Sequence, residues 1–297
     1  MIHLTKKYLE RFPAIVVSHG LFAFVERILH LSKSFVDDSR FRMYVLGRAL
    51  YHIKNPIECR ANRELLRRLR TSLNRSTNSE PLISVIIPTY NRAKILTERT
   101  IPSVLRQTYQ NFELIIVGDH CTDNTEELIG KLHDKRIGFL NLEKRKDHPK
   151  DPYLRWMVAG VVPVNKGLEL ASGRWIAHLD DDDEFSEDHL EQLLKHALEH
   201  DYEMVYGIIQ MEIEPGKWMN VGSYPPEEAK ICRLSALYDS KLRLFRYDIN
   251  AWKYLEPADW NLWRRMKEAG VKIGFVDKVV GKHYLERAGL RTETSAP

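Results

Sequence analysis

Between residues 82 and 180 the sequence alternates short apolar runs, rich in β-branched residues, with stretches of helical periodicity. Such runs predict strands and helices in turn. Strands are expected at about residues 82–88, 112–117, 136–142 and 174–179, with helices between them at about residues 94–108, 121–133 and 164–172. A strand, a helix and a strand at this spacing form a right-handed crossover between parallel strands. The pattern therefore predicts an α/β fold whose sheet has helices on both faces.

Polar side chains follow three of the expected strands, in the sequences PTYNR (88–92), GDHCTD (118–123) and DDDD (180–183). Ligands of open α/β sheets bind beyond the carboxyl ends of the strands. Four adjacent carboxylates repel one another, which a fold tolerates most readily where a cation binds. Taken alone, the acidic run would suit a solvated turn as well. The convergence of three polar clusters at one edge favours a binding site.

The first 80 residues have a different character, because Lys and Arg number 15 there against 7 Asp and Glu, although the net charge of the whole chain is only +4. They read as several short amphipathic helices. A polar, loop-like stretch at residues 74–81 ends with a proline. We therefore predict a basic helical segment at residues 1–80 and an α/β domain at residues 81–297.

The cysteines and the first residues indicate a compartment. Cys59, Cys121 and Cys232 lie far apart and form no CxxC pair, which argues against a zinc site or a disulfide framework and favours a reducing environment. The first residues do not look like a secretory signal, and the most apolar early stretch is interrupted by charged residues. We expect a cytoplasmic protein without a spanning helix.

Four blocks of the sequence, in this order, resemble those of family 2 glycosyltransferases with a GT-A fold: SVIIPTYNRAKIL (84–96), SVLRQTYQNFELIIVGDHCTDNT (103–125), NKGLELASGRWIAHLDDDDEF (165–185) and EPADWNLWRRMKEAGVKIGFVDKVVGKHY (256–284). The resemblance covers residues 82 to about 285. It implies a mixed, mostly parallel GT-A sheet. It also implies an inverting enzyme of polysaccharide biosynthesis that moves a sugar from a nucleoside diphosphate to a hydroxyl, usually with Mn²⁺ or Mg²⁺.

The resemblance places four residues of the first polar cluster, Pro88, Thr89, Tyr90 and Arg92, against the nucleoside. Tyr90 is suited to packing on a base, and Arg92 has a fork of donors that suits a phosphate. A capped strand-to-helix turn is the alternative interpretation of this cluster.

Asp119 occupies the position at which the family reads the base through its ring N–H. Here the family pattern VDDGSTD is VGDHCTD, with Gly118, His120 and Cys121 as departures. Because of these departures, the identity of the base as uracil is only an expectation. The nearby Asp123 suits the start of a helix better than ligand binding.

The metal motif of the family, Asp-x-Asp, corresponds to Asp180 and Asp182, with the register open by one residue. A divalent cation held there would neutralise the charge that grows on a diphosphate leaving group. Asp180 and Asp181 are also expected beside the nucleotide, and Asp183 beside the donor sugar. His283 falls where many GT-A enzymes have another metal ligand, although a structural histidine suits that place equally.

The acidic block near residue 256 supplies the general base in the resemblance. Asp259 is the first candidate and Glu256 the second, because inversion needs a carboxylate that removes the proton from the attacking hydroxyl. Asp259 would also suit the first turn of a helix. Trp260 and Trp263 fit either sugar stacking or core packing.

Other functions remain open on the sequence alone. A GT-A nucleotidyltransferase would have a glycine-rich loop after the first strand, which PTYNRAKIL lacks. A catalytically silent, sugar-nucleotide-binding relative is a further alternative. No nucleic-acid-binding signature is present, so no nucleic acid partner is expected.

The expected partners are a nucleotide-sugar donor and an acceptor that is a glycan, a lipid-linked sugar or a small molecule. The basic N-terminal helices suit peripheral contact with the inner face of an anionic membrane. They would equally suit packing on the α/β domain or a homodimer contact.

Overall fold

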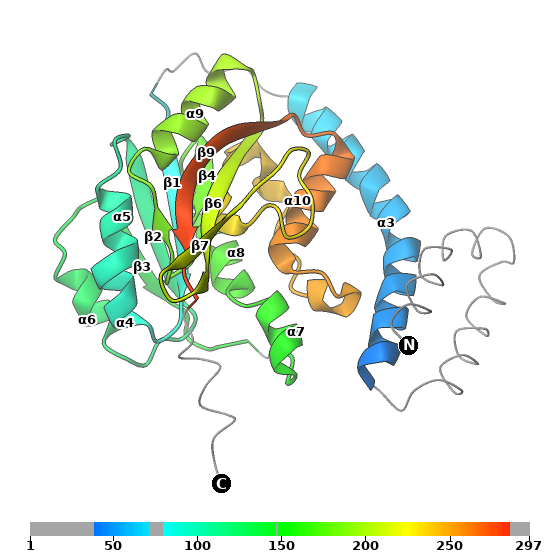
Figure 1. The fold of residues 1–297 in the computed structure, drawn as a ribbon, viewed down its shortest axis with the longest axis horizontal. Helices are drawn as coiled ribbons and strands as arrows, with labels where there is room; N and C mark the ends of the chain where they lie inside the picture. Colours follow the sequence, from blue (N-terminus) through cyan, green and yellow to red (C-terminus); the bar gives the residue numbers. More distant parts are fainter. Residues whose placement is uncertain (1–38, 72–79, 147, 286–297) are drawn as a thin grey trace, which may run out of the picture. The chain divides into compact units, whose positions relative to one another are not determined.

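The computed structural model describes residues 39–71, 80–146 and 148–285 of the 297-residue chain. The chain divides into two units, residues 1–54 with 253–255 and residues 55–252 with 256–297. In the smaller unit, the Lys54 ammonium lies 4.8 Å from the ring centroid of Tyr254. All the candidate site residues belong to the larger unit, and Figure 1 shows its helices and strands.

The described helices are α3 (Ser39–Thr71), α4 (Ala93–Ile95), η1 (Leu96–Thr100), α5 (Ile101–Leu105), α6 (Thr125–Gly130), α7 (Pro152–Met157), α8 (Val161–Leu170), α9 (His189–Glu199), η2 (Arg233–Ser235), η3 (Ser240–Leu244), η4 (Ala251–Tyr254) and α10 (Ala258–Ala269). The described strands are β1 (Ile83–Thr89), β2 (Phe112–Gly118), β3 (Ile137–Asn141), β4 (Trp175–His178), β5 (Glu184–Phe185), β6 (Met204–Glu214), β7 (Lys217–Val221), β8 (Ala236–Asp239) and β9 (Ile273–His283).

One mixed sheet organises the larger unit, with the strand order β3-β2-β1-β4-β8-β6-β9-β5 and β7 paired with β6. Strands β3, β2, β1 and β4 run parallel, as the alternation in the sequence predicts. Strand β8 is antiparallel to both of its neighbours, β4 and β6, whereas β9 is parallel to β6. The predicted α/β fold with a mixed, mostly parallel sheet is confirmed.

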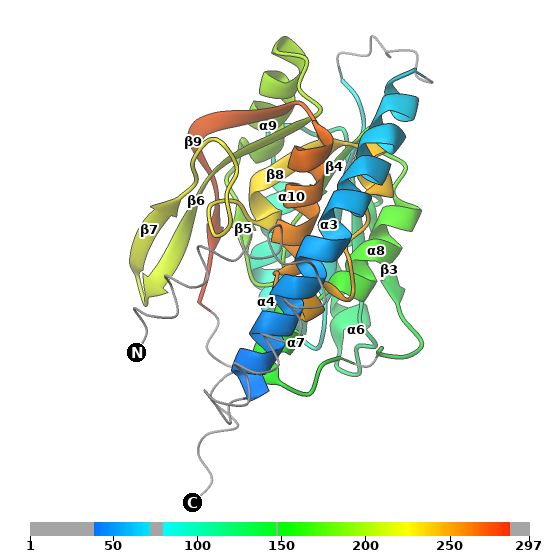
Figure 2. The same cartoon turned by 90° about the vertical axis from the view of Figure 1, so that its right-hand side faces the viewer.

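Helices cover both faces of this sheet, as Figures 1 and 2 show. Successive side chains of a strand point to opposite faces. On β1, Val85 and Ile87 therefore join a core layer with α5 and α9, whereas Ile86 joins the other layer with α8 and α10. Because both layers are buried, β1 is apolar on both of its faces, as expected for a central parallel strand.

The helix expected at residues 94–108 is present but interrupted. It consists of α4, the π-helical turn η1 and α5, and in the widened turn the Ile101 N–H donates to the Leu96 carbonyl. Pro102 follows at once. A proline lacks the N–H of a regular turn and its ring clashes with the carbonyl four residues earlier, so a local widening before it is expected.

The N-terminal region differs from its prediction of several short helices. Its described part is the single 33-residue helix α3, which contains Pro56, and residues 1–38 lie outside the described residues. Within the larger unit, Leu66 is buried in the core and Arg63 Nε donates to the Glu268 carbonyl at 3.0 Å. The predicted boundary between residues 80 and 81 stays a prediction. No helix in the described ranges is both long and apolar enough to cross a membrane.

A buried ion pair in this region predicts a pH-dependent stability. Glu203 accepts hydrogen bonds from Arg70 Nε at 3.0 Å and Nη2 at 2.5 Å. Burial alone would raise the pKa of Glu203, but the hydrogen bonds from Arg70 and from the Lys272 backbone lower it from 4.5 to about 2. The stability that a lowered folded-state pKa contributes is complete above the unfolded value and is lost as the pH falls through the folded one.

We therefore expect the stability difference between the wild type and Glu203→Gln to shrink as the pH falls from about 4.5 towards 2. Urea unfolding at pH 7, 4.5 and 3 measures this difference. Asp277→Asn, at an exposed position of β9, is the control and should show no such trend. A Glu203→Gln difference that stays constant over this pH range would contradict the assignment.

Candidate active site

The carboxyl ends of β1, β2 and β4 meet at one edge of the sheet, as predicted. The backbone N–H of Asp119, after β2, donates to the Thr89 carbonyl at 2.8 Å. The backbone N–H of Tyr90, after β1, donates to Asp181 Oδ2 at 3.3 Å. From η1, the hydroxyl of Thr100 donates to the Asp181 carbonyl at 2.9 Å, which fixes the backbone of the acidic run.

Each of the four aspartates has a cationic partner. Arg92 Nη1 lies 3.3 Å from Asp181 Oδ1 and also pairs with Asp182. Arg233 Nη1 lies 2.5 Å from Asp180 Oδ1. Asp183 pairs with a histidine, as described next. The run is therefore not a solvated turn: it is a partly buried cluster of ion pairs at the tip of β4.

Asp183 has a different environment from its neighbours, because its side chain is 0% exposed. Its carboxylate accepts hydrogen bonds from His283 Nδ1 at 2.9 Å and from the Tyr284 backbone N–H at 3.1 Å. Burial lowers the pKa of an imidazole, but here the hydrogen bond and the charge of Asp183 raise the pKa of His283 to about 9. His283 is thus positioned as a protonated partner of Asp183, and Asp183 has no face open to a sugar.

Burial also affects the protonation of the acidic cluster. It raises the pKa of Asp181 from 3.8 to about 7, against the opposing charge of Arg92. Burial likewise raises the pKa of Asp182. Arginine alone therefore does not compensate the cluster fully, which is the condition under which a further cation is favourable.

The donor atoms suit a hard divalent cation, because Mg²⁺ and Mn²⁺ prefer carboxylate oxygens and keep several water ligands. Asp180 and Asp182 remain partly exposed, with side-chain exposures of 34% and 15%. Within residues 39–71, 80–146 and 148–285, no group of three or more His, Cys, Asp or Glu residues is arranged to hold a metal ion. One or two carboxylates suffice for a cation that also binds a diphosphate.

The polar clusters after β1 and β2 contact an arginine that was not predicted from the sequence. Arg145 Nε donates to Asp119 Oδ2 at 2.9 Å, and its guanidinium lies 3.7 Å from the Tyr90 ring centroid. His148 Nε2 lies 3.5 Å from the same carboxylate oxygen. Asp119 Oδ1 is buried and has no hydrogen-bond partner in the described chain. A buried acceptor of this kind is suited to an N–H donor of a ligand.

The turn after β1 also has structural roles. Asn91 adopts a positive φ of 50°, and its Oδ1 accepts a hydrogen bond from the Thr122 N–H at 2.8 Å. Asp123 Oδ1 accepts from the Thr125 N–H at 3.2 Å, but the N-cap of α6 is Asn124 and not Asp123. The side chain of Pro88 lies against Gly160, where an added Cβ would be 3.3 Å away. Thr89 is buried.

The two candidate bases have different surroundings. Glu256 is buried in a bidentate pair with Arg264, Nε to Oε1 at 2.8 Å and Nη2 to Oε2 at 3.0 Å, and also accepts from Asn261 Nδ2 at 2.7 Å.

Asp259, the other candidate base, is half-buried. Its carboxylate accepts from the Trp260 N–H at 2.8 Å. Burial raises the pKa of Asp259, opposed first by the charge of Arg233, and the charge of Asp180 raises it further.

The buried Arg233 pairs with Asp180 of the acidic tip, and its charge also acts on the candidate base Asp259. In addition to Asp180, it donates from Nη2 to the Ala159 carbonyl at 3.3 Å, and its guanidinium lies 5.4 Å from the Tyr247 ring centroid. Neither Arg233 nor Arg145 was predicted from the sequence. Neither belongs to a local motif, because each contacts the site through residues more than 20 positions away.

The two tryptophans of α10 also differ. Trp263 is fully buried, and its ring packs edge-on against those of Tyr238 at 5.8 Å and Tyr247 at 6.4 Å. Trp260 is partly buried at the edge of the same core layer. Core packing accounts for Trp263, whereas Trp260 keeps an exposed face.

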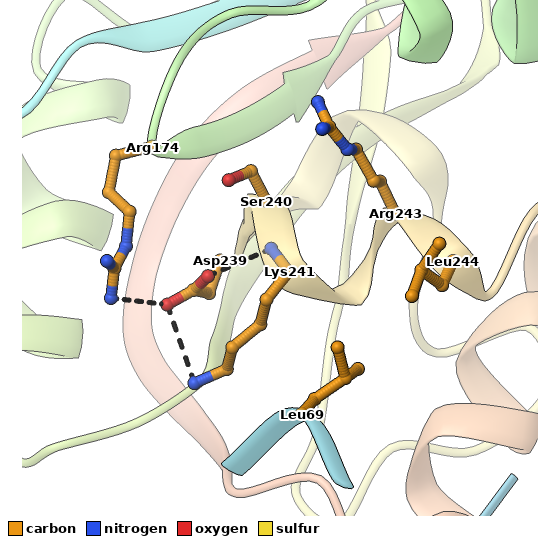
Figure 3. Close-up of a pocket in the computed structure, with 7 residues that line it drawn as sticks. All are labelled: Leu69, Arg174, Asp239, Ser240, Lys241, Arg243 and Leu244. Atoms are coloured by element: carbon orange, nitrogen blue, oxygen red, sulfur yellow. Dashed lines mark hydrogen bonds and ion pairs between the residues drawn. The ribbon is translucent and has the colours of Figure 1, made fainter. Parts of the chain in front are cut away.

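A cavity of about 310 Å³ lies elsewhere in the larger unit (Figure 3). Asp239, at its centre, pairs with Arg174 Nη2 at 2.8 Å and Lys241 Nζ at 3.5 Å. Arg174 precedes β4, whereas the acidic run follows it, so the cavity lies at the opposite end of that strand. It is not part of the candidate site.

A mixed sheet with polar clusters after its first and second strands, and an acidic cluster after its fourth, has the GT-A-type fold. The chain belongs to glycosyl transferase family 2, whose model matches residues 84–150 and 161–252.

Two curated relatives match part of the chain. The putative teichuronic acid biosynthesis glycosyltransferase TuaG of Bacillus subtilis is 38% identical over 125 residues, 41% of this chain and 44% of that protein. The Escherichia coli UDP-Glc:alpha-D-GlcNAc-diphosphoundecaprenol beta-1,3-glucosyltransferase WfgD is 36% identical over 126 residues, 42% and 45% of the two chains. The matches thus span less than half the length of these relatives.

Solved structures share the fold at low identity. S. aureus TarS 1–349 in complex with UDP-GlcNAc has a TM-score of 0.55 at 19% identity, over 69% of this chain and 58% of that one. The mannosyltransferase PcManGT from Pyrobaculum calidifontis, in complex with GDP-Man and Mn²⁺, has a TM-score of 0.53 at 16% identity, over 83% and 70%. These likenesses support the GT-A architecture.

Proposed function

We propose that this protein transfers a sugar from a UDP-sugar to an acceptor hydroxyl with inversion at the anomeric carbon. The observation that carries the proposal is the arrangement of Asp259, Arg233 and Asp180. Asp259 is a half-buried carboxylate on which the charge of Arg233 acts, and Arg233 in turn pairs with Asp180 of the acidic cluster at the end of β4. Such a pairing suits a reaction in which one group removes a proton while another region receives a growing negative charge.

Asp119 and Tyr90 bind the nucleoside in this proposal. The buried Asp119 Oδ1 accepts a hydrogen bond from the ring N–H of uracil, and the Tyr90 ring packs on the base. In the structure the Arg145 guanidinium lies over the Tyr90 ring and donates to the Asp119 carboxylate. When the base binds, Arg145 therefore either contacts it or moves aside. Arg92 is placed to bind a phosphate oxygen.

Asp182 and Asp180 would hold Mn²⁺ or Mg²⁺, and the bound cation would supply charge neutralisation for the diphosphate leaving group. Arg92 and Arg233, which now pair with these carboxylates, keep the cluster compact and add positive charge beside the leaving group. The similar PcManGT structure is a complex with Mn²⁺, which supports a divalent cation without identifying it here.

Asp259 is the general base. Burial raises its pKa, which makes the carboxylate a better proton acceptor than an ordinary aspartate, and the charge of Arg233 opposes this shift. Glu256 cannot accept a proton without breaking its bidentate pair with Arg264, so its role is to position the start of α10. The exposed face of Trp260 is suited to contact the acceptor.

The acceptor is a lipid-linked or polysaccharide glycan in this proposal. The names of two relatives support it, since one refers to teichuronic acid biosynthesis and the other to a diphosphoundecaprenol-linked acceptor. The sugar that is moved stays open.

Asp182→Ala tests the cation-binding role. We expect this change to weaken UDP binding in Mn²⁺ by about tenfold or more, because a hard cation loses one of its few protein ligands, and to leave the weaker binding in EDTA unchanged. Titration calorimetry of UDP with each variant measures this. Asp277→Asn, in an exposed position, is the control. Equal affinities of the wild type and Asp182→Ala for UDP in Mn²⁺ would show that a neighbouring aspartate, and not Asp182, binds the cation.

A further inference from the structure

The outer face of α7 exposes two large aromatic side chains. Tyr153 and Trp156 are 59% and 62% exposed, and their rings stack with centroids 6.1 Å apart and planes at 19°. The other face of α7 is already anchored, because Leu154 and Met157 are buried. Figure 1 shows α7 at the periphery of the larger unit, away from the sheet. A paired Trp and Tyr exposed in this way indicates an interaction surface.

The segment that leads to these aromatics is strongly basic. Residues 144–156 contain five Lys or Arg against two Asp. One of the two, Asp151, is used structurally, since its Oδ1 accepts from the Tyr153 N–H at 2.9 Å and the Leu154 N–H at 3.1 Å. All five cationic side chains are exposed. We call this the aromatic–basic surface, made of Lys144, Arg145, Lys146, Lys150, Tyr153, Arg155 and Trp156.

This surface adjoins the nucleoside side of the candidate site. Arg145 belongs to both, because it contacts Tyr90 and Asp119. At the other end of α7, the Ala159 carbonyl accepts a hydrogen bond from the buried Arg233. Whatever binds the aromatic–basic surface is therefore held beside the donor and acceptor positions.

We propose that the aromatic–basic surface docks on an anionic phospholipid bilayer, with Tyr153 and Trp156 inserted at the headgroup level. Trp and Tyr are the residues favoured at membrane interfaces, and exposed Lys and Arg are attracted to anionic headgroups. The dock brings the candidate site to the plane in which the phosphates of a lipid-linked acceptor lie. The idea that docking serves a lipid-linked acceptor rests on the proposed function, whereas membrane docking itself does not.

A carbohydrate is the other ligand that stacks on aromatic side chains. A neutral sugar would account for the two rings but not for the excess of cations around them, whereas an anionic surface accounts for both. The charge complementarity therefore favours the membrane.

Co-sedimentation of the full chain with vesicles tests the proposal without donor or acceptor. We expect binding to vesicles of phosphatidylcholine with phosphatidylglycerol, and much weaker binding to phosphatidylcholine alone or at high salt. The double variant Tyr153→Ser/Trp156→Ser should bind the anionic vesicles about tenfold more weakly or worse. Each of Lys144→Gln, Lys146→Gln and Lys150→Gln should cost about fivefold.

Tyr224→Ser is the matched control, because Tyr224 is also 62% exposed and lies outside this segment. It should bind vesicles as the wild type does. Quenching of tryptophan fluorescence by spin-labelled lipid should occur in the wild type and largely disappear in Trp156→Phe.

Two results would overturn the proposal. One is a wild type that ignores anionic vesicles, and the other is a double variant that binds them as well as the wild type, since another segment would then make the contact. A double variant that keeps vesicle binding but loses transfer to a water-soluble acceptor would instead identify a sugar-stacking platform. If vesicle binding follows the prediction while no sugar is transferred, only the proposed function fails.

Discussion

Asp259→Asn is expected to lower kcat by about 10²- to 10⁴-fold, the usual contribution of a positioned general base. An asparagine amide has nearly the same shape but cannot accept the proton of the attacking hydroxyl. The change should leave UDP affinity within about twofold, because the proposed mechanism gives Asp259 no role in binding the nucleotide. Single-turnover release of UDP from a UDP-sugar, together with calorimetric titration of UDP, measures both quantities.

Two comparisons make the Asp259→Asn result specific. Asp277→Asn changes the same functional group at an exposed position of β9 and should keep full activity. Glu256→Gln should act mainly on stability, because Glu256 is engaged by Arg264 and Asn261. Normal turnover by Asp259→Asn would show that another acid is the base.

Trp263→Ala is expected to destabilise the protein by about 3–5 kcal/mol, the range for removing a large aromatic side chain from a core. Trp263 is fully buried, and its ring contacts Tyr238 and Tyr247 between the sheet and α10. The surrounding strands restrict collapse into the space it leaves, so the cavity cost adds to the lost hydrophobic transfer free energy. Urea unfolding followed by circular dichroism measures the difference.

Trp156→Ala is the matched control for Trp263→Ala, since it removes the same side chain from an exposed position and should change stability by only about 0.5 kcal/mol or less. If Trp263→Ala left the unfolding midpoint unchanged and weakened acceptor binding instead, Trp263 would face the acceptor and the core assignment would fail.

The parallel half of the sheet was predictable because its signals are local. Each of β1, β2 and β4 is a short apolar run followed by polar residues, and the helices between them have clear periodicity. The placement of β8 between β4 and β6 was not predictable, because antiparallel pairing of residues about 60 positions apart leaves no local mark in the sequence. The π-helical turn before Pro102 was also missed, although a proline inside a helix is a known cause of such an interruption.

The acidic run was found from the sequence because four adjacent aspartates after a buried strand are unusual. Its partner Arg233 was not found. Arg233 resembles any other arginine in a basic, irregular stretch, and only the fold brings it to Asp180. Glu256 and Asp259 lie three residues apart in one block, and their different roles follow from burial and pairing, which residue type does not encode. Burial likewise distinguishes Trp263, which is fully buried, from Trp260, which is only partly buried.

The central claim is that the β4 tip binds the diphosphate of a nucleotide sugar, and its most direct test is the release of nucleoside diphosphate. Wild-type protein is mixed with a panel of UDP- and GDP-sugars in Mn²⁺, Mg²⁺ or EDTA, and the released diphosphate is measured. We predict UDP release that requires a divalent cation and that falls in Asp182→Ala. A protein that neither binds nor releases a nucleoside diphosphate with any of these cations would contradict the claim.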